Sequence, residues 1–200
     1  MSTLPEDFYE RIKPRLRRRI GEELRLAARV LDLGCGNCEL AEYLAEAYDQ
    51  EVLGVDLKDP ASPERPALVS GAVDCVQADA ARLGFLHGGQ VDAVVSVWAL
   101  HEMARPERAL REARRVLRPG GEILVVDFPR NSLARRLWNE GYYTVGEVRD
   151  LLRGASFDRV RARTIERRQI IWATGVRTRS GRGRGRAPRA PARATGRREA

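Results

Sequence analysis

The chain has little cysteine, little histidine and no long apolar run. Its 200 residues include three cysteines and two histidines, and a chain of this length buries a core without disulfides or a structural metal. No apolar run approaches the roughly 20 residues that a membrane-spanning helix needs. Residues 1–19 also lack the apolar segment of a secretory signal. We therefore expect one soluble domain in the cytoplasm, without membrane insertion.

The few cysteines leave a metal site incomplete. Cys35 and Cys38 form a C-x-x-C at the start of a predicted helix, a pattern that also occurs in redox thiols and in half of a zinc site. The third cysteine, Cys75, is expected to be buried. No second C-x-x-C and no histidine pair completes a zinc site. We expect reduced thiols and no metal.

Positive charge is concentrated at one end. The net charge is +8, nine arginines against Glu199 lie in residues 175–200, and the rest of the chain is balanced. This segment is rich in Gly, Arg, Ala and Pro without apolar periodicity, which predicts a disordered tail. Such a tail attracts nucleic acid weakly and without sequence preference. Alternatively, it reflects the arginine bias of a chain whose lysines are only Lys13 and Lys58.

Strand and helix patterns alternate along the chain. The expected strands are 29–33, 51–56, 75–78, 91–97, 122–128, 159–164 and 169–173. The expected helices are 5–28, where Pro14 kinks or divides the helix, 38–48, 105–117 and 145–154, with weaker patterns at 62–71 and 80–85. Nearly continuous apolar runs at 91–97 and 122–128 are typical of parallel strands covered on both faces. The last two strands read as an antiparallel hairpin.

These patterns predict an α/β, doubly wound, Rossmann-like sheet. We expect a helical cap at 1–28, the main domain at 29–174 and the tail at 175–200. No internal repeat is present.

A glycine turn follows the first expected strand. Gly34 and Gly36, with Cys35 between them, permit a sharp turn and close approach of a ligand to the backbone. Asp32, just before the turn, is placed to reach the ammonium of an amino acid through water or a turn amide. In an open α/β sheet, ligands bind at such carboxyl ends of the strands.

Acidic residues also end the next two strands. Asp56 is suited to accept both hydroxyls of a ribose, and Leu57 can pack on a purine face. Asp79 can accept from an adenine amino group, and the Ala80 amide can bind a ring nitrogen. A dinucleotide is disfavoured, because Glu39 stands where the G-x-G-x-x-G pattern places its third glycine.

The motifs around these residues resemble the class I S-adenosylmethionine-dependent methyltransferases, in particular the small-molecule branch that includes the ubiquinone and menaquinone biosynthesis methyltransferases. The matching segments are VLDLGCGNCELAEYLA (30–45), VLGVDL (52–57), QADA (77–80), VDAVVSVWALHEM (91–103) and EARRVLRPGGEILVVDF (112–128). The resemblance covers about residues 29–174. It implies a seven-stranded sheet with an antiparallel final strand and S-adenosylmethionine as cofactor, with its sulfonium near the carbonyls of Ser96 to Trp98. Cys38 departs from the family, in which many members have glycine.

Candidate acceptor residues follow the fourth and fifth strands. His101 lies where acceptors approach the sulfonium in the resembling family, and a neutral imidazole there can act as a base; alternatively, it begins the next helix and orients loops. Segment 130–143 lies where this fold places its substrate cover. We expect Arg130 to pair with an acidic acceptor. Aromatic residues in strand-end or loop segments are expected to wall an acceptor pocket, or alternatively to belong to the core. They are Trp98, Phe128, Trp138, Tyr142 and Tyr143.

The function predicted from these motifs is direct, in-line methyl transfer from S-adenosylmethionine to a small-molecule acceptor. One alternative is an RNA or protein methyltransferase that uses the basic tail. The segment SVWALHE (96–102) replaces the Asn-Pro-Pro-Tyr type of tetrad expected for methylation of nucleobase amino groups. A second alternative is a non-catalytic protein that binds the cofactor. The acceptor and the oligomeric state stay open.

Overall fold

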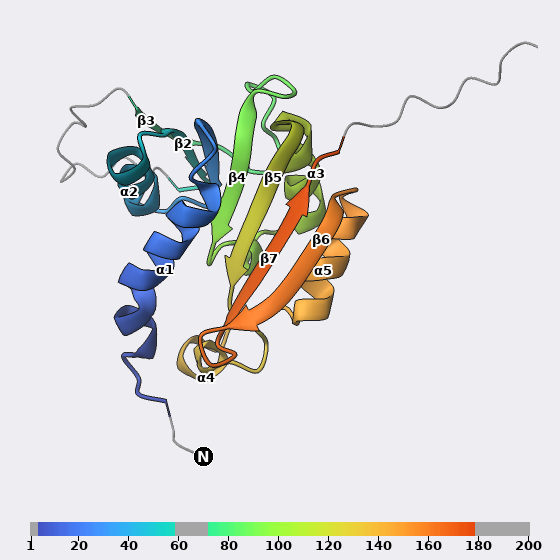
Figure 1. The fold of residues 1–200 in the computed structure, drawn as a ribbon. Coiled ribbons are helices and arrows are strands. Elements are labelled where there is room, and N and C mark those ends of the chain that lie inside the picture. The colour runs from blue at the N-terminus through green and yellow to red at the C-terminus, as the bar shows by residue number, and fades with distance from the viewer. Residues whose placement is uncertain (1–3, 59–71, 179–200) are drawn as a thin grey trace, which may run out of the picture.

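In the computed structural model, which describes residues 4–58 and 72–178, the strands of those residues form one seven-stranded sheet with helices on both faces (Figure 1). The strands are β1 (Arg29–Leu33), β2 (Glu51–Asp56), β3 (Val73–Gln77), β4 (Val91–Val97), β5 (Leu117–Asp127), β6 (Asp158–Ile165) and β7 (Ile170–Val176). The helices are α1 (Phe8–Leu24), α2 (Glu39–Tyr48), α3 (Pro106–Val116), α4 (Leu133–Trp138) and α5 (Val145–Gly154), with a 3-10 turn, η1 (Leu100–Glu102).

The strand order is β3-β2-β1-β4-β5-β7-β6. Strands β1 to β5 pair in parallel, whereas β7 runs antiparallel to both β5 and β6. This confirms the predicted doubly wound, mostly parallel sheet with an antiparallel final strand. The chain order reverses between β1 and β4, which is where open α/β sheets form their ligand crevice.

Neighbouring residues of the central strands pack on opposite faces. Val30 and Ala93 belong to the core that α1, α2 and α4 cover, and Leu31 and Val94 belong to the core under α3 and α5. All four are at most 1% exposed. Because both faces are covered, most positions of these strands are apolar, which accounts for the nearly continuous runs seen in the sequence.

Helix α1 lies along one face of the sheet and ends close to β1 (Figure 1). Its buried side follows the predicted three- and four-residue spacing, with Ile12, Leu16 and Ile20 at most 2% exposed. The predicted division at Pro14 is wrong, because the helix runs through it. Pro14 is exposed, so water can satisfy the helix carbonyl that loses its partner there.

Some local predictions are wrong. Residues 80–85 form turns instead of a helix, and the Glu112 carboxylate accepts from the Leu83 N–H at 3.0 Å. Strand β5 begins at Leu117, five residues early, with a register irregularity opposite β4 between Val91 and Ala93. Helix α4 was missed because six residues are too few to establish a helical period.

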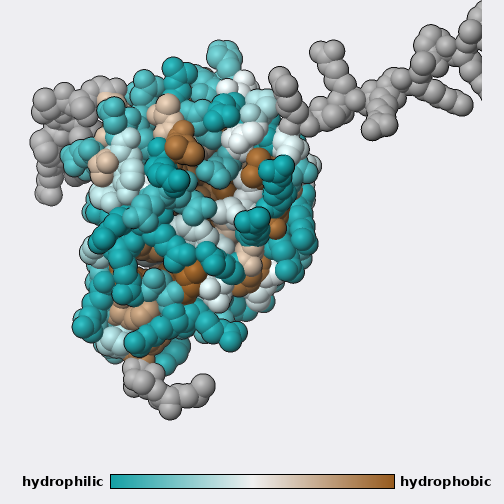
Figure 2. Space-filling view, viewed as in Figure 1, coloured by the Kyte–Doolittle hydropathy of each residue, from teal (hydrophilic) through white to brown (hydrophobic). Residues whose placement is uncertain are grey.

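The predicted disordered tail begins too early. Gly175 and Val176 pair with β5 inside β7, and the Arg177 N–H donates to the Gly121 carbonyl at 2.8 Å. Residues 179–200 and the expected helix at 62–71 lie outside the described residues. Among the described residues, no helix is long and apolar enough to cross a membrane. Figure 2 shows a mostly hydrophilic face with hydrophobic residues exposed in separate small patches.

Candidate functional site

The predicted glycine turn forms at the carboxyl end of β1. Gly34 has a φ of +76°, and a Cβ there would lie 2.2 Å from the Ala99 Cβ, so glycine is required on both grounds. The N–H groups of Gly34 and Cys35 donate to the Val55 carbonyl at 2.8 and 3.2 Å. These bonds hold the turn over the end of β2, beside the predicted cofactor residues Asp56 and Leu57.

Asp56 ends β2 and holds the turn. Its carboxylate accepts from the Gly36 N–H at 2.9 Å and from the Lys58 N–H at 3.0 Å. The next side chain, Leu57, is 64% exposed and lines a cavity. A ligand that covers Leu57 would remove this apolar surface from water.

Asp79 follows β3 and is tied to a residue that sequence reasoning missed. One oxygen accepts from the Ala81 N–H at 2.8 Å, and the other lies 2.5 Å from Nη2 of Arg105. Asp79 and Ala80 line one cavity. An adenine amino group would therefore share the Asp79 carboxylate with Arg105.

Asp32 is buried beneath the turn. Burial raises the pKa of its carboxyl to about 7, and the charge of Asp56 adds to the increase. A buried carboxylate without a cation is costly. A ligand ammonium at this position would favour the ionised form and bring the pKa down.

Two cavities meet at Gly34. One, of about 300 Å³, is lined by Asp32, Trp98 and the α1 residues Lys13, Leu16, Arg17 and Ile20. The other, of about 330 Å³, is lined by Asp56, Leu57, Asp79 and Ala80, with Met103 and Arg105 opposite. We call these two neighbouring cavities over the strand ends the crevice; they suit a ligand with a nucleoside at one end and a charged group at the other.

His101 and Asp127 form a buried pair next to this crevice. The imidazole Nδ1 lies 2.7 Å from Oδ1 of Asp127, and the His101 N–H donates to Oδ2 at 3.1 Å. The Asp127 residue is 1% exposed. On its other side, Nε2 of His101 lies 2.9 Å from Oε2 of Glu140, whose side chain is 47% exposed.

The neighbouring carboxylates control the charge of His101. Burial on its own would lower the imidazole pKa, but the hydrogen bond to Asp127, the charge of Asp127, the hydrogen bond to Glu140 and the charge of Glu102 outweigh it and raise the pKa. Asp127 was missed from the sequence. Its signal was an acid at the carboxyl end of a parallel strand, the same signal that identified Asp56.

Aromatic side chains surround Phe128. Trp98 stacks on it with 5.3 Å between ring centroids, and Trp138 and Tyr142 lie 5.2 and 5.6 Å away. The His101 ring is 4.6 Å from that of Tyr142. The predicted acceptor residues Trp98, Trp138, Tyr142 and His101 thus converge, and Trp138 keeps 47% of its surface exposed.

Two predicted acceptor residues lie apart from this cluster. Arg130 forms two bonds with the Glu147 carboxylate, at 2.7 and 2.8 Å, and donates to the Tyr142 carbonyl. Glu147 also closes the capping box of α5 with Thr144. Tyr143 packs with the core under α3 and α5, on the opposite face from Phe128.

Ser96 and Trp98 carry polar atoms with unused bonding capacity. Ser96 is 2% exposed at the end of β4. Across residues 4–58 and 72–178, neither the Ser96 Oγ nor the Trp98 Nε1 has a hydrogen-bond partner. Trp98 has a φ of 55°, a conformation that non-glycine residues adopt mainly where tertiary structure holds them. The backbone bends sharply here, at the boundary between the crevice and the aromatic cluster.

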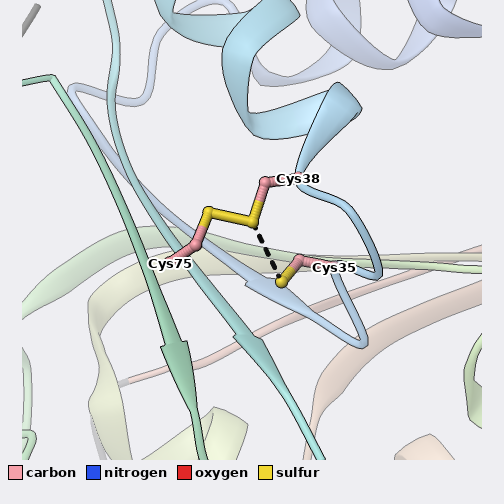
Figure 3. A group of neighbouring side chains, drawn as sticks. All are labelled: Cys35, Cys38 and Cys75. Atoms are coloured by element: carbon pink, nitrogen blue, oxygen red, sulfur yellow. Dashed lines mark hydrogen bonds between the residues drawn. A yellow bond between two sulfur atoms is a disulfide. The ribbon is translucent and has the colours of Figure 1, made fainter. Parts of the chain in front are cut away.

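The prediction of reduced thiols is wrong for two cysteines, because Cys38 and Cys75 form a disulfide (Figure 3). The Sγ of Cys35 lies 3.3 Å from that of Cys38. Cys75 is partly rather than fully buried. Sequence spacing gave no sign of the pairing, because the turn and β3 meet only when the sheet forms. The expected absence of a metal stays a prediction.

The fold and the strand-end residues define an α/β protein with cavities suited to a nucleoside-containing ligand. A family model for a methyltransferase domain matches residues 31–125. A demethylmenaquinone methyltransferase of Thermus thermophilus is 41% identical over 105 residues, which cover 50% of this chain and 47% of that protein. A ubiquinone/menaquinone biosynthesis C-methyltransferase of Azotobacter vinelandii is 35% identical over 125 residues, covering 58% and 49%. The chain thus spans about half the length of these curated relatives.

A solved structure supports the fold. The 1,6-didemethyltoxoflavin-N1-methyltransferase of Burkholderia thailandensis, which has S-adenosylhomocysteine bound, superposes with a TM-score of 0.65 over 86% of this chain and 84% of that one, at 22% identity. With the matches in sequence, residues 31–125 are a methyltransferase domain, and the chain is similar to S-adenosylmethionine-dependent methyltransferases. The resemblance predicted from the motifs is confirmed.

Proposed function

We propose that this chain binds S-adenosylmethionine in the crevice over the strand ends and promotes transfer of its methyl group to a small-molecule acceptor held by the aromatic cluster. The observation that carries the proposal is the meeting of two cavities at Gly34, with Asp32 in one and Asp56 and Asp79 in the other. This arrangement separates an ammonium site from a nucleoside site.

The nucleoside half is assigned to three segments. Each Asp56 oxygen accepts one backbone N–H, and since a carboxylate oxygen has further acceptor capacity, both can also accept a ribose hydroxyl. Leu57 covers one face of the base. Asp79 and the Ala80 amide are assigned to its polar edge.

The amino-acid half is assigned to the cavity above Asp32. The Asp32 carboxylate is buried with a pKa of about 7, so an ammonium would find there a group that gains from a positive partner. Lys13 and Arg17, which line the same cavity, supply positive charge for a carboxylate. The carbonyls of Ser96 to Trp98 are assigned to the sulfonium end.

Bound S-adenosylmethionine supplies an electrophilic methyl group on a positively charged sulfur. The chain's own residues hold the acceptor and manage its proton. Asp127 faces Nδ1 of His101 and Glu140 faces Nε2, so the imidazole that donates to both carboxylates is the protonated form. When the Nε2 proton is lost, Asp127 keeps the remaining proton on Nδ1, and the lone pair lies on Nε2. When an acceptor displaces the exposed Glu140 carboxylate, Nε2 can take its proton as a general base.

The acceptor that fits this surface is a small molecule with a planar, apolar body and an ionisable nucleophile. Trp98, Phe128, Trp138 and Tyr142 offer ring faces and edges. The demethylmenaquinone named for the Thermus relative is of this kind, which supports the class of acceptor.

The location in the cytoplasm and the contact of the tail with nucleic acid stay predictions. An RNA or protein methyltransferase would depend on the basic tail, whereas a small-molecule enzyme would not. Truncation after Thr178 separates the two, because a small-molecule enzyme keeps its turnover. Loss of turnover without loss of donor binding would favour the macromolecular acceptor.

The decisive experiment has two arms. Calorimetry with S-adenosylmethionine tests the cofactor site, and no binding at millimolar donor would refute the proposal. A metabolite screen with methyl-labelled donor then compares the wild type with His101→Ala. Loss of labelling with unchanged donor affinity is expected; retained labelling would remove His101 from the acceptor chemistry, and a protein that binds donor but labels nothing would be a non-catalytic binder.

A further inference from the structure

The side chains of all three cysteines of the chain lie together beside the turn that contains Gly34 and Gly36, which we call the cofactor turn (Figure 3). Cys35 lies in the turn, Cys38 directly precedes α2, and Cys75 lies in the edge strand β3. Their sulfur atoms all lie within 4.8 Å of one another. The disulfide between Cys38 and Cys75 therefore fastens the cofactor turn to a strand two positions away in the sheet.

The sheet leaves room for this cluster at Gly54. Gly54 is the β2 residue in register with Cys75, and a Cβ on it would lie 2.8 Å from Sγ of Cys35 and 2.9 Å from Sγ of Cys38. Real Cβ atoms do not approach so closely, so any larger residue would displace the sulfurs. The turn, the edge strand and the strand between them are shaped together around the cysteines.

The disulfide acts on a residue with an unfavourable backbone. Cys38 has a φ of 61°, in the left-handed region that costs a residue with a side chain free energy. Its N–H donates to the Cys35 carbonyl at 2.9 Å, which closes the turn around the Gly36 N–H bound to Asp56. The covalent tie to β3 is placed to hold this conformation, and without it Cys38 is expected to relax toward ordinary backbone angles.

We propose that Cys35, Cys38 and Cys75 form a thiol–disulfide exchange site that sets the affinity of the turn for the methyl donor, with low-molecular-weight thiols as its reaction partners. The proposal rests on the proposed function, because it assigns donor binding to this turn. The oxidised form, with Cys38 bonded to Cys75, is the form that binds donor tightly.

Accessibility fixes the order of the chemistry. Cys75 is the partly exposed residue of the pair, whereas Cys38 is 0% exposed, so the attack of an external thiolate is assigned to the Cys75 sulfur. A mixed disulfide forms at Cys75, and the electron pair of the broken bond leaves with Cys38, which takes a proton from water. A second thiol then displaces Cys75; the two external thiols become one disulfide, and the protein gains two electrons and two protons.

Cys35 provides a second, internal route. It is not part of the disulfide, and its Sγ lies 3.3 Å from that of Cys38. After loss of its proton, the Cys35 thiolate can attack the Cys38 sulfur, so that a Cys35–Cys38 bond forms and Cys75 leaves as the thiolate. No net oxidation occurs. This exchange detaches the turn from β3 and draws it together around Gly36.

The test uses the purified full chain, oxidised or treated with a dithiol, and S-adenosylmethionine as the probe. Alkylation before and after reduction, followed by peptide mapping, is expected to find the Cys38–Cys75 pair in the oxidised form. Reduction is expected to raise the donor Kd roughly fivefold to tenfold. This is the fold-change that corresponds to the cost of placing one residue with a side chain in the left-handed region. By linkage, saturating donor makes the disulfide midpoint potential about 20 to 30 mV more negative.

Two matched variants separate the effect of the disulfide from the effect of the backbone conformation at Cys38. Cys38→Gly has no disulfide to Cys75 and no side-chain penalty at that φ, so its donor Kd is expected to be the same with and without reductant. Cys75→Ser keeps the penalty without the tie, and its Kd is expected to match that of the reduced wild type. Far-UV circular dichroism of the reduced wild type confirms that the chain is still folded.

Several results would overturn the proposal. These are equal donor Kd, within twofold, for oxidised and reduced wild type, alkylation of all three cysteines without reductant, or a stoichiometric metal ion that protects all three thiolates. If neither form binds donor, both the proposed function and this inference are refuted. Equal binding by both forms refutes this inference alone.

Discussion

His101 and Asp127 lie 26 residues apart in the chain, yet Nδ1 and Oδ1 of their side chains are 2.7 Å apart. β4 and β5 are neighbouring parallel strands, and their carboxyl ends bring η1 and Asp127 together. Asp127 also accepts from the Phe128 N–H at 2.7 Å, so its carboxylate is fixed before any acceptor arrives. The pair gives the imidazole one orientation and one tautomer.

Asp127→Asn is therefore expected to lower kcat about 100-fold, the scale of a lost general base, because an amide can donate to Nδ1 and favour the wrong tautomer. Steady-state kinetics and calorimetry check this. Donor Kd should stay within twofold, whereas the melting temperature should fall, because the amide nitrogen cannot accept one of the two backbone N–H groups that Asp127 binds. An unchanged kcat would show that His101 needs no oriented tautomer.

Glu140→Gln is expected to shift the acid limb of the pH dependence of kcat to lower pH. The reason is that Glu140 contributes to the raised pKa of His101, so its removal makes the neutral base available at lower pH. A pH–rate profile of both proteins measures the shift. Arg136→Gln, a change at an exposed residue of α4, is the control and should leave the profile in place.

Asp56→Ala is expected to weaken S-adenosylmethionine binding by about one to three kcal/mol, the scale of hydrogen bonds lost from a polar partner. The carboxylate holds both the Gly36 N–H and the Lys58 N–H, so the turn itself also loosens. Calorimetry measures this change in binding free energy. Asp49→Ala, at the far end of α2, controls for loss of an acidic side chain, and an equal loss there would refute the assignment.

Donor affinity is expected to rise about tenfold from pH 5.5 to 7, because the Asp32 carboxyl, with a pKa of about 7, must ionise to meet an ammonium. Calorimetry in two buffers of different ionisation enthalpy should detect proton release near pH 6. Asp32→Asn should bind more weakly at pH 7 and lose this dependence. A wild-type affinity that is flat across the range would contradict the assignment.

The stability of the donor-free protein should fall as pH rises from 5.5 to 8. A raised carboxyl pKa at Asp32 makes the folded state hold a proton that the unfolded state has lost, and ionisation near pH 7 removes this advantage. The raised pKa of His101 acts in the same direction above pH 6.5. Thermal melts test this, and a smaller fall is expected for Asp32→Asn.

The sequence was sufficient to predict the strands that position the cofactor site. β1, β2 and β4 form at their predicted bounds, because buried parallel strands are continuous apolar runs and the glycines and aspartates at their ends break those runs sharply. The α4 helix and the early start of β5 were not predictable from pattern, because both depend on pairing and packing with distant segments. Arg130 was expected to face an acceptor, but the Glu147 carboxylate binds it instead.

What the sequence alone determined is the order of strands and helices, the glycine turn and the acids at the carboxyl ends of β1, β2 and β3, since these depend on local periodicity and backbone freedom. Only the tertiary structure decided which distant groups meet. It paired His101 with Asp127, gathered the aromatic rings around Phe128 and brought Cys75 to Cys38 across Gly54. Such pairings depend on strand order and register, which are set by packing of the whole sheet rather than by any one segment.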